Sequence, residues 1–216
     1  MEISEMLRMV GFRLKEGDED MLIFSKIDAL KEEYKSDCRI RQNGTVLLGS
    51  DKTLPLYSRH ILFKPLSQEL IDDFLISDYK YNVPAQYITF LKYSNGMSLF
   101  TTKRKIAGFR IARPTLTVYG IPRTQPHGRA PEMEEPFDIR IEDLGRHDDI
   151  AENWLKCGSY TKDSDFNVTY DIFIDTASNR VYSCVRNDNK IACDWNDLDS
   201  CLCYLFEVLK DTKSEY

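Results

Sequence analysis

Hydrophobic residues recur at spacings of three and four in four stretches of the chain, which predicts four amphipathic helices. These stretches cover residues 20–36, 67–77, 84–95 and 198–209. The apolar stripe of the last stretch is continuous and consists of Leu198, Cys201, Leu202, Leu205 and Leu209. Asn196 or Asp197 can cap this helix at its N-terminus. We therefore expect the helix to close the fold, with Leu202 and Leu205 buried against a sheet.

The second and third predicted helices also carry end signals. Ser67 can cap the second helix. Its inward-facing residues are expected to be Leu70, Ile71, Phe74 and Leu75. Pro84 suits the first position of the third helix, where its missing N–H is not needed. The apolar stripe of that helix consists of Tyr87, Ile88, Phe90 and Leu91. Asn95-Gly96 ends the helix, because glycine tolerates the left-handed backbone that closes helices.

Short runs of β-forming residues, separated by Gly, Pro and Asn, predict strands. The strongest turn signal is Asn43-Gly44, which predicts a hairpin of residues 38–41 and 45–48. Further strands are expected at residues 98–100, 106–111, 116–119, 137–141, 154–160, 168–175, 180–186 and 190–194, with an irregular loop at 120–136. The fold class is therefore α+β: a mostly antiparallel sheet that takes up about five to seven of these strands and is flanked by helices, with an N-terminal helix and hairpin as an extension.

Composition agrees with a globular domain and gives no sign of a membrane protein. The 216 residues are 42% hydrophobic and 30% charged. The longest apolar run covers residues 201–206, whereas a membrane span needs roughly twenty apolar residues. Because no secretion signal is visible either, we expect a cytoplasmic protein. Its six cysteines should then be reduced and act as small buried hydrophobic residues.

Charge is distributed unevenly along the chain. Residues 1–130 contain 20 basic and 15 acidic residues, a net charge of +5, and residues 131–216 contain 9 and 20, a net charge of −11. Residues 79–131 contain no acidic residue at all. This asymmetry indicates either a charged partner or two parts of one domain that neutralise each other.

No residue pattern predicts a catalytic or metal centre, and we expect neither enzyme activity nor a cofactor. The three histidines form no His-x-x-x-His pair, and neither a nucleophile elbow nor a phosphate loop is present. Cys157 with His147 is the pair that a thiol mechanism would use. Cys201 and Cys203 are closer in sequence than zinc ligands usually are. Asp163-x-Asp165 resembles the start of a calcium loop, but the glycine and glutamate that complete one are missing.

A nucleic-acid platform is the alternative suggested by the acid-free segment. There, aromatic residues alternate with basic ones: Phe100, Phe109 and Tyr119 stand among Lys103, Arg104, Lys105, Arg110 and Arg113. The sequence pI of about 5.2 opposes this interpretation, because nucleic-acid domains are usually strongly basic. Aromatic residues in short strands are also more often part of a core.

Residues 83–96, with the sequence VPAQYITFLKYSNG, resemble the opening motif of the SUKH superfamily, which includes fungal regulators of cell-wall synthesis. The residues that carry this motif are Pro84, Tyr87, Leu91, Asn95 and Gly96. Later segments are similar to the family and come in the same order. They are the strand with Gly158, the hairpin at 171–184 and the closing helix at 198–209. These motifs are structural, so they imply the fold and no active site.

The resemblance covers residues 67–210, which we expect to form a SUKH-like domain. Residues 1–66 are expected to be an N-terminal extension packed on this core, and residues 211–216 a frayed tail. The resemblance also implies a bacterial immunity protein that binds and neutralises a cognate toxin, often a nuclease. A regulatory scaffold that binds other cellular proteins is the alternative. Neither function involves a membrane, and the oligomeric state is left open.

Contact residues do not follow from the resemblance, but the charge pattern suggests some. A nuclease toxin has a basic cleft, because it must attract phosphate. Carboxylates on an inhibitor would steer it toward such a cleft. The candidates are the acidic residues Glu132, Glu134, Glu135, Asp148, Asp149, Asp163 and Asp165. If they only keep their loops soluble, the contact surface lies elsewhere.

Overall fold

The computed structural model describes residues 21–50, 58–77, 83–106, 109–120, 153–162, 168–186, 188 and 190–211. They form a nine-stranded sheet in which every neighbouring pair is antiparallel. The strand order is β1 (Cys38–Ile40), β2 (Val46–Ser50), β3 (Ser58–Leu62), β4 (Met97–Leu99), β7 (Leu116–Val118), β8 (Trp154–Thr161), β9 (Thr169–Asp175), β10 (Val181–Val185) and β11 (Ile191–Trp195). The predicted α+β class is confirmed.

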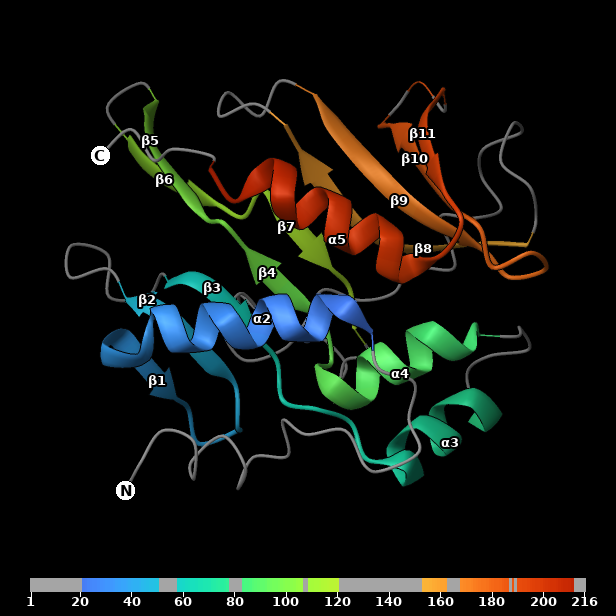
Figure 1. The fold of residues 1–216 in the computed structure, drawn as a ribbon, viewed down its shortest axis with the longest axis horizontal. Coiled ribbons are helices and arrows are strands. Elements are labelled where there is room, and N and C mark those ends of the chain that lie inside the picture. Colours follow the sequence, from blue (N-terminus) through green and yellow to red (C-terminus); the bar gives the residue numbers. More distant parts are fainter. Residues whose placement is uncertain are drawn as a thin grey trace.

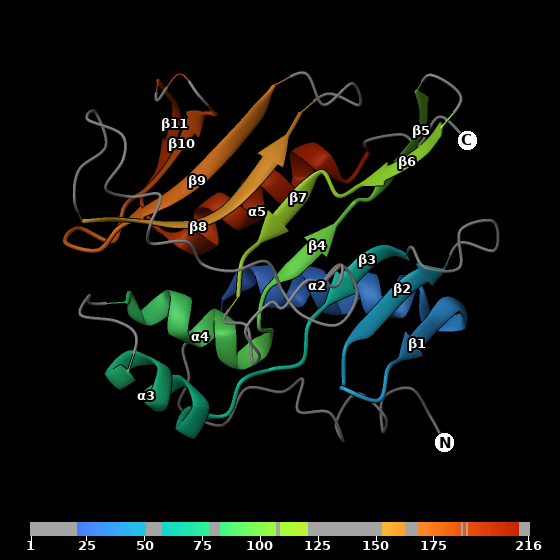
Figure 2. The same cartoon turned by 180° about the vertical axis from the view of Figure 1, so that it is seen from behind.

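Helices cover one broad face of this sheet. The helices are α2 (Leu22–Glu33), α3 (Gln68–Ser77), α4 (Ala85–Tyr93) and α5 (Leu198–Leu209), and a short 3₁₀ turn covers Lys35–Asp37. Helices α2 and α5 lie on the same face, α2 over β2 to β4 and α5 over β7 to β9 (Figure 1). From behind, the strands lie in front of both helices, and α3 and α4 lie together beside the sheet (Figure 2).

The sheet is larger than the five to seven strands expected. The predicted hairpin at Asn43-Gly44 is confirmed as β1–β2, with Gly44 at φ 87°. Strand β3, which the sequence pattern did not reveal, pairs with β2 on one side and β4 on the other. The N-terminal strands therefore extend the same sheet. The segment boundary near residue 66 stays a prediction, although the sheet and the hydrophobic core run across it.

The predicted strand at 106–111 is wrong in detail. Ile106 ends β5 (Thr102–Ile106) and pairs with Phe109, which begins β6 (Phe109–Arg113). The two strands form a separate hairpin between β4 and β7 in the chain. The predicted strand at 137–141 and the loop after Gly120 lie outside the described residues.

Helix ends agree closely with the sequence signals. Asp197 caps α5, its Oδ1 accepting from Ser200 N at 2.8 Å. Ser67 Oγ accepts from Leu70 N at 3.3 Å and so caps α3. Helix α4 begins one residue after Pro84, and the chain turns away at Gly96, which has φ 88°.

The core lies between the sheet and the helices. All five residues of the predicted α5 stripe are at most 1% exposed: Leu198, Cys201, Leu202, Leu205 and Leu209. In α3 the expectation is wrong for Leu70, which is 41% exposed, whereas Ile71 is buried. The reason is the position of α3 beside the sheet, where only one side of the helix meets the core. The side chains of Phe74 and Leu75 lie outside the described residues.

The residues of the SUKH-like motif fix the packing of α4 and β8. Tyr87 is fully buried, and its hydroxyl donates to Tyr119 O at 2.8 Å. A Cβ on Gly158 would lie 2.5 Å from Thr117 O, and one on Gly120 would lie 2.3 Å from Asn95 O. Both glycines therefore permit backbone contacts that a larger residue would prevent.

Candidate functional site

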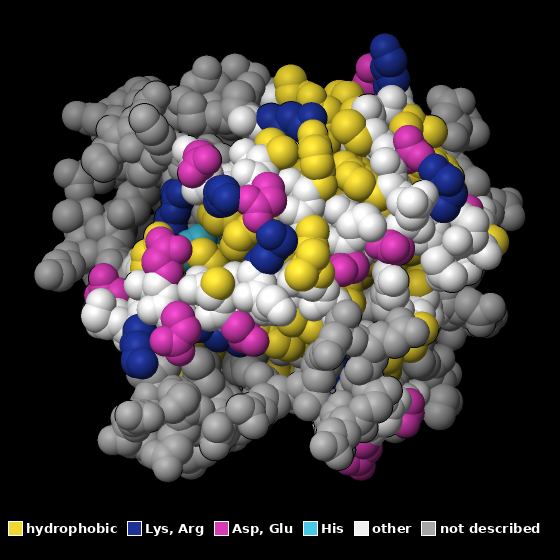
Figure 3. All heavy atoms as spheres, in the orientation of Figure 1, with side chains coloured by type: hydrophobic (Ala, Val, Ile, Leu, Met, Phe, Trp, Pro, Cys, Tyr) yellow, Lys and Arg dark blue, Asp and Glu magenta, His cyan; other side chains and the backbone are white. Residues whose placement is uncertain are grey.

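A cavity of about 380 Å³ opens between α2, α5, β3 and the end of β4. Its lining residues are Lys26, Ala29, Leu30, Glu33, Tyr34, Arg59, His60, Phe100, Phe206, Glu207, Lys210 and Asp211. In the space-filling view a histidine is visible at the bottom of a hollow whose rim carries basic and acidic side chains (Figure 3). Cavities of this size are typical of ligand or side-chain binding sites.

Four rings form the floor of the cavity. Tyr34 and His60 have centroids 5.1 Å apart, His60 and Phe100 5.2 Å, and Phe100 and Phe206 5.2 Å. Each contact is tilted or edge-to-face, the geometry that aromatic quadrupoles favour. The row connects α2 through β3 and β4 to α5, so the cavity floor is part of the core.

The backbone of Phe100, at the centre of this row of rings, is strained. Its φ is 56°, in the left-handed region that a large side chain adopts only when its surroundings enforce it. Phe100 N donates to His60 Nδ1 at 3.3 Å, and Phe100 O accepts from Thr115 Oγ1 at 3.2 Å. The next residue is tied to β3 as well, because Thr101 N donates to Arg59 O at 2.9 Å. This turn directs the Phe100 ring toward α5.

His60 is a neutral hydrogen-bond donor at the floor. It is 1% exposed, and burial, together with the nearby charge of Arg59, lowers its pKa from 6.5 to about 3. Because Nδ1 accepts from Phe100 N, the single proton of the neutral ring resides on Nε2. Within the described part of the chain Nε2 has no hydrogen-bond partner. It is not fully enclosed either, because among the described residues the only fully enclosed side-chain nitrogen or oxygen without a partner is Thr102 Oγ1. His60 lines the cavity and Nε2 is not fully enclosed, so we infer that its N–H faces the cavity.

Charged side chains of both signs surround the opening. Glu207 forms ion pairs with Lys26 and Lys210. Hydrogen bonds from Lys210 and then Lys26 lower the pKa of Glu207 to about 2. Burial lowers the pKa of Arg59, whose guanidinium donates a hydrogen bond to the hydroxyl of Tyr34.

Two backbone features hold the walls of the cavity in place. Gly49 has φ 67°, and a Cβ there would lie 2.8 Å from Arg59 Cβ and 3.0 Å from Tyr34 Cε1. Asp199 of α5 accepts from the backbone N of Leu22 and Ile23 at 3.0 and 2.9 Å, which fastens the start of α2 to α5.

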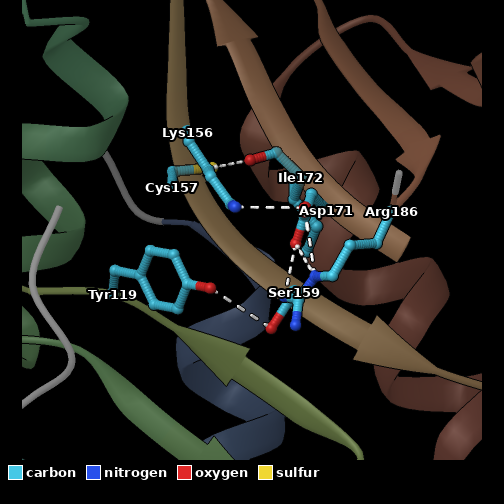
Figure 4. A network of polar contacts seen from close by, with 7 residues as sticks. All are labelled: Tyr119, Lys156, Cys157, Ser159, Asp171, Ile172 and Arg186. Carbon is cyan, nitrogen blue, oxygen red and sulfur yellow. Dashed lines mark hydrogen bonds and ion pairs between the residues drawn. The ribbon is translucent and has the colours of Figure 1, made fainter. Parts of the chain in front are cut away.

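A second polar cluster lies on the sheet face opposite α5, centred on Asp171 (Figure 4). Arg186 donates to the Asp171 carboxylate from Nε at 3.1 and 3.2 Å and from Nη2 at 2.6 Å. Lys156 Nζ lies 3.0 Å from Asp171 Oδ2. Tyr119 OH donates to Ser159 Oγ at 3.4 Å beside this group. Hydrogen bonds from Arg186 to Asp171 raise the pKa of the guanidinium.

None of the predicted contact residues lies among the described residues. Glu132, Glu134, Glu135, Asp148, Asp149, Asp163 and Asp165 all lie outside the described residues, as does His147. The side chains of the basic hairpin, from residue 103 to 112, are not described either. The roles expected for these residues therefore remain predictions.

The cysteines are all free thiols. Cys157, Cys184 and Cys201 are buried, which confirms for these three the prediction that they act as small hydrophobic residues. Burial is the main cause that raises the pKa of Cys184 to about 11, which makes it a poor nucleophile. Cys38, Cys193 and Cys203 are half-buried.

Sequence reasoning missed the cavity residues Arg59, His60 and Phe100. One signal was present: His60 stands directly before the apolar run of residues 61–63, a setting in which a histidine is easily enclosed. Their meeting depends on the pairing of β3 with β4, which short-range patterns do not reveal.

Comparison with family models, curated proteins and solved structures finds no match. Among the described helices, none is both long and apolar enough to cross a membrane. In the described part of the chain no group of three or more His, Cys, Asp or Glu residues is placed to hold a metal ion.

The buried state of His60 predicts a loss of stability in mild acid. The unfolded chain protonates His60 below its ordinary pKa of 6.5, whereas the folded chain does so only near 3, so falling pH favours unfolding. Between about pH 7 and about pH 5 this one group should remove about 2 kcal/mol of the free energy of unfolding. Urea unfolding of the wild type and of His60→Gln at both pH values measures the difference. Equal pH dependence in the two proteins would contradict a neutral buried His60.

Proposed function

We propose that this chain is a cytoplasmic protein-binding domain of the SUKH type that neutralises a toxin by direct contact. The SUKH-like segments identified in the sequence are the basis for the choice of family. In the fold, the motif residues Tyr87, Gly96 and Gly158 serve packing and backbone turns. A protein of this kind therefore uses other surfaces for its partner.

The observation that carries the proposal is an apolar patch formed by α5 and the edge strand β11. Tyr204 is 44% exposed and Val208, one turn further along α5, is 43% exposed. Trp195 of β11 packs on Tyr204 with ring centroids 5.8 Å apart, and Ile191 of the same strand is 51% exposed. Hydrophobic side chains gather over α5 and the adjacent strands on this side (Figure 3).

Such a patch suits a protein partner better than a small molecule. Exposed Tyr and Trp are enriched where proteins meet, because they bury a large area with few rotatable bonds. Strand β11 also has a free edge within the described sheet, where unpaired backbone groups can receive a partner strand. A partner that covers the patch would bury Tyr204 and Trp195 together.

The proposal is tested by co-expression with the product of the neighbouring toxin gene. We expect growth to be restored by the wild type, and the affinity measured by titration calorimetry to fall about tenfold or more in Tyr204→Ala. Leu70→Ala is the matched control, because Leu70 is similarly exposed but lies on α3. If no neighbouring gene encodes a toxin and no growth rescue occurs, the immunity function is wrong and a regulatory scaffold takes its place.

A further inference from the structure

We propose that the cavity between α2 and α5 is a binding site for a neutral aromatic group with a hydrogen-bond acceptor, namely the phenol side chain of a tyrosine from the protein partner. This inference rests on the proposed function as a protein-binding domain. It adds a site on a different part of the surface from the α5–β11 patch. Three features of the cavity define the chemistry of its occupant.

The floor selects a ring. Tyr34, His60, Phe100 and Phe206 present a continuous aromatic surface on which one more ring can pack edge-to-face or offset. A cavity of about 380 Å³ is large enough for one aromatic side chain together with the backbone that carries it. An aliphatic side chain would fill the space but gain less from the ring edges.

The Nε2–H of His60 selects an acceptor on that ring. This donor is fixed because Nδ1 is occupied by Phe100 N, and the low pKa of about 3 keeps the ring neutral at physiological pH. A donor in so buried a position is stabilised when an acceptor satisfies it. The oxygen of a phenol stands at the far end of its planar ring and so reaches the bottom of the cavity. A benzene ring has no acceptor at that position.

The rim selects a neutral group. Three basic residues, Lys26, Arg59 and Lys210, and three acidic residues, Glu33, Glu207 and Asp211, surround the opening. Lys26 and Lys210 are both engaged with Glu207. A nucleotide or another polyanion would need an excess of positive charge that the rim does not have. A tyrosine side chain carries no charge. The backbone N–H and C=O groups beside it can hydrogen-bond to the acidic and the basic side chains of the rim, respectively.

The walls of the site are held by the fold itself, and a rigid wall lowers the ordering cost of binding. The positive φ of Phe100, the close approach of Gly49 to Tyr34 and the link from Asp199 to α2 all restrict movement there. Backbone strain of this kind persists where the surroundings enforce it and is concentrated at functional sites.

The test uses two small probes, p-cresol for the tyrosine side chain and toluene for its counterpart without the oxygen. Each is titrated into the full ¹⁵N-labelled chain while amide chemical shifts are followed. We expect p-cresol to bind about fivefold more tightly than toluene, the ratio that one neutral hydrogen bond gives, with shifts at the amides of residues 60 and 100. Equal binding of the two probes, or shifts confined to other regions, would overturn the proposal.

Two substitutions locate the site. His60→Phe should remove the preference for p-cresol, but it also leaves Phe100 N without its acceptor and can unfold the chain. Ala29→Trp avoids this problem, because Ala29 is exposed on α2 and lines the opening, so the indole covers the cavity without entering the core. It should abolish binding of both probes, whereas Ser25→Trp, exposed on the same helix but outside the lining, should not. Unchanged p-cresol binding in Ala29→Trp would refute the site.

The outcome separates this inference from the proposed function. If toxin neutralisation is observed but Ala29→Trp neutralises as well as Ser25→Trp, the partner does not use the cavity and the inference is wrong. If p-cresol binds as expected but no toxin partner exists, the cavity takes a free phenol and the immunity function is wrong. Loss of both p-cresol binding and neutralisation in Ala29→Trp alone supports both.

Discussion

Asp171→Asn is expected to lower the free energy of unfolding by about 3 kcal/mol, because it breaks a largely buried ion-pair cluster. The Asp171 side chain is 9% exposed and that of Lys156 is 13% exposed, so the lysine would keep its charge in a poorly hydrated position after losing this partner. Arg186 is 42% exposed and can turn toward water, which places the cost at the low end of the range for buried pairs. Asparagine preserves the shape of the side chain, so the change reports on charge.

Asp194→Asn is the matched control for this experiment. Asp194 also pairs with an arginine, Arg180, but both side chains are about half exposed, at 50% and 45%. Exposed pairs contribute about 0–1 kcal/mol, because water and salt screen them. Urea denaturation of the two variants gives the comparison. Equal losses would mean that the Asp171 cluster is as well screened by solvent as the surface pair.

The sequence predicted well wherever local chemistry decides the structure. Helix α5 was predicted because a continuous stripe and an Asp cap act within twelve residues. The β9–β10 hairpin was predicted because its two strands are adjacent in the chain. Alternation alone could not show that Asp171 is buried, since both faces of this part of the sheet contain buried residues.

Longer-range features were missed for a physical reason. Strand β3 is buried at four of its five residues, so it shows no alternation of polar and apolar positions that would identify it. The cavity combines residues from α2, β3, β4 and α5, and His60 and Phe100 are 40 residues apart. Such a site arises only when β3 and β4 pair. The single strand expected at 106–111 is another example, because Ile106 ends β5 and pairs with Phe109 at the start of β6.

Leu202→Ala and Leu205→Ala are each expected to cost about 2–5 kcal/mol of unfolding free energy. Both leucines lie on the buried face of α5, in the core that the sheet shares with α2 and α5. Truncation therefore leaves a cavity that the surrounding residues cannot fill. Against a total stability of about 5–15 kcal/mol, either change alone removes a large part of the folding free energy.

Val208→Ala provides the control on the same helix. Val208 is 43% exposed, so its truncation should cost no more than about 0.5 kcal/mol of unfolding free energy. Alanine also has a higher helix propensity than valine, so the helix itself is not weakened. Chemical denaturation of the three variants measures the differences directly. Losses below about 0.5 kcal/mol in both leucine variants would mean that α5 does not close the core. Because Leu202 and Leu205 are neighbours on one face, the double variant should cost less than the sum of the single ones, since the second truncation enlarges a cavity that already exists.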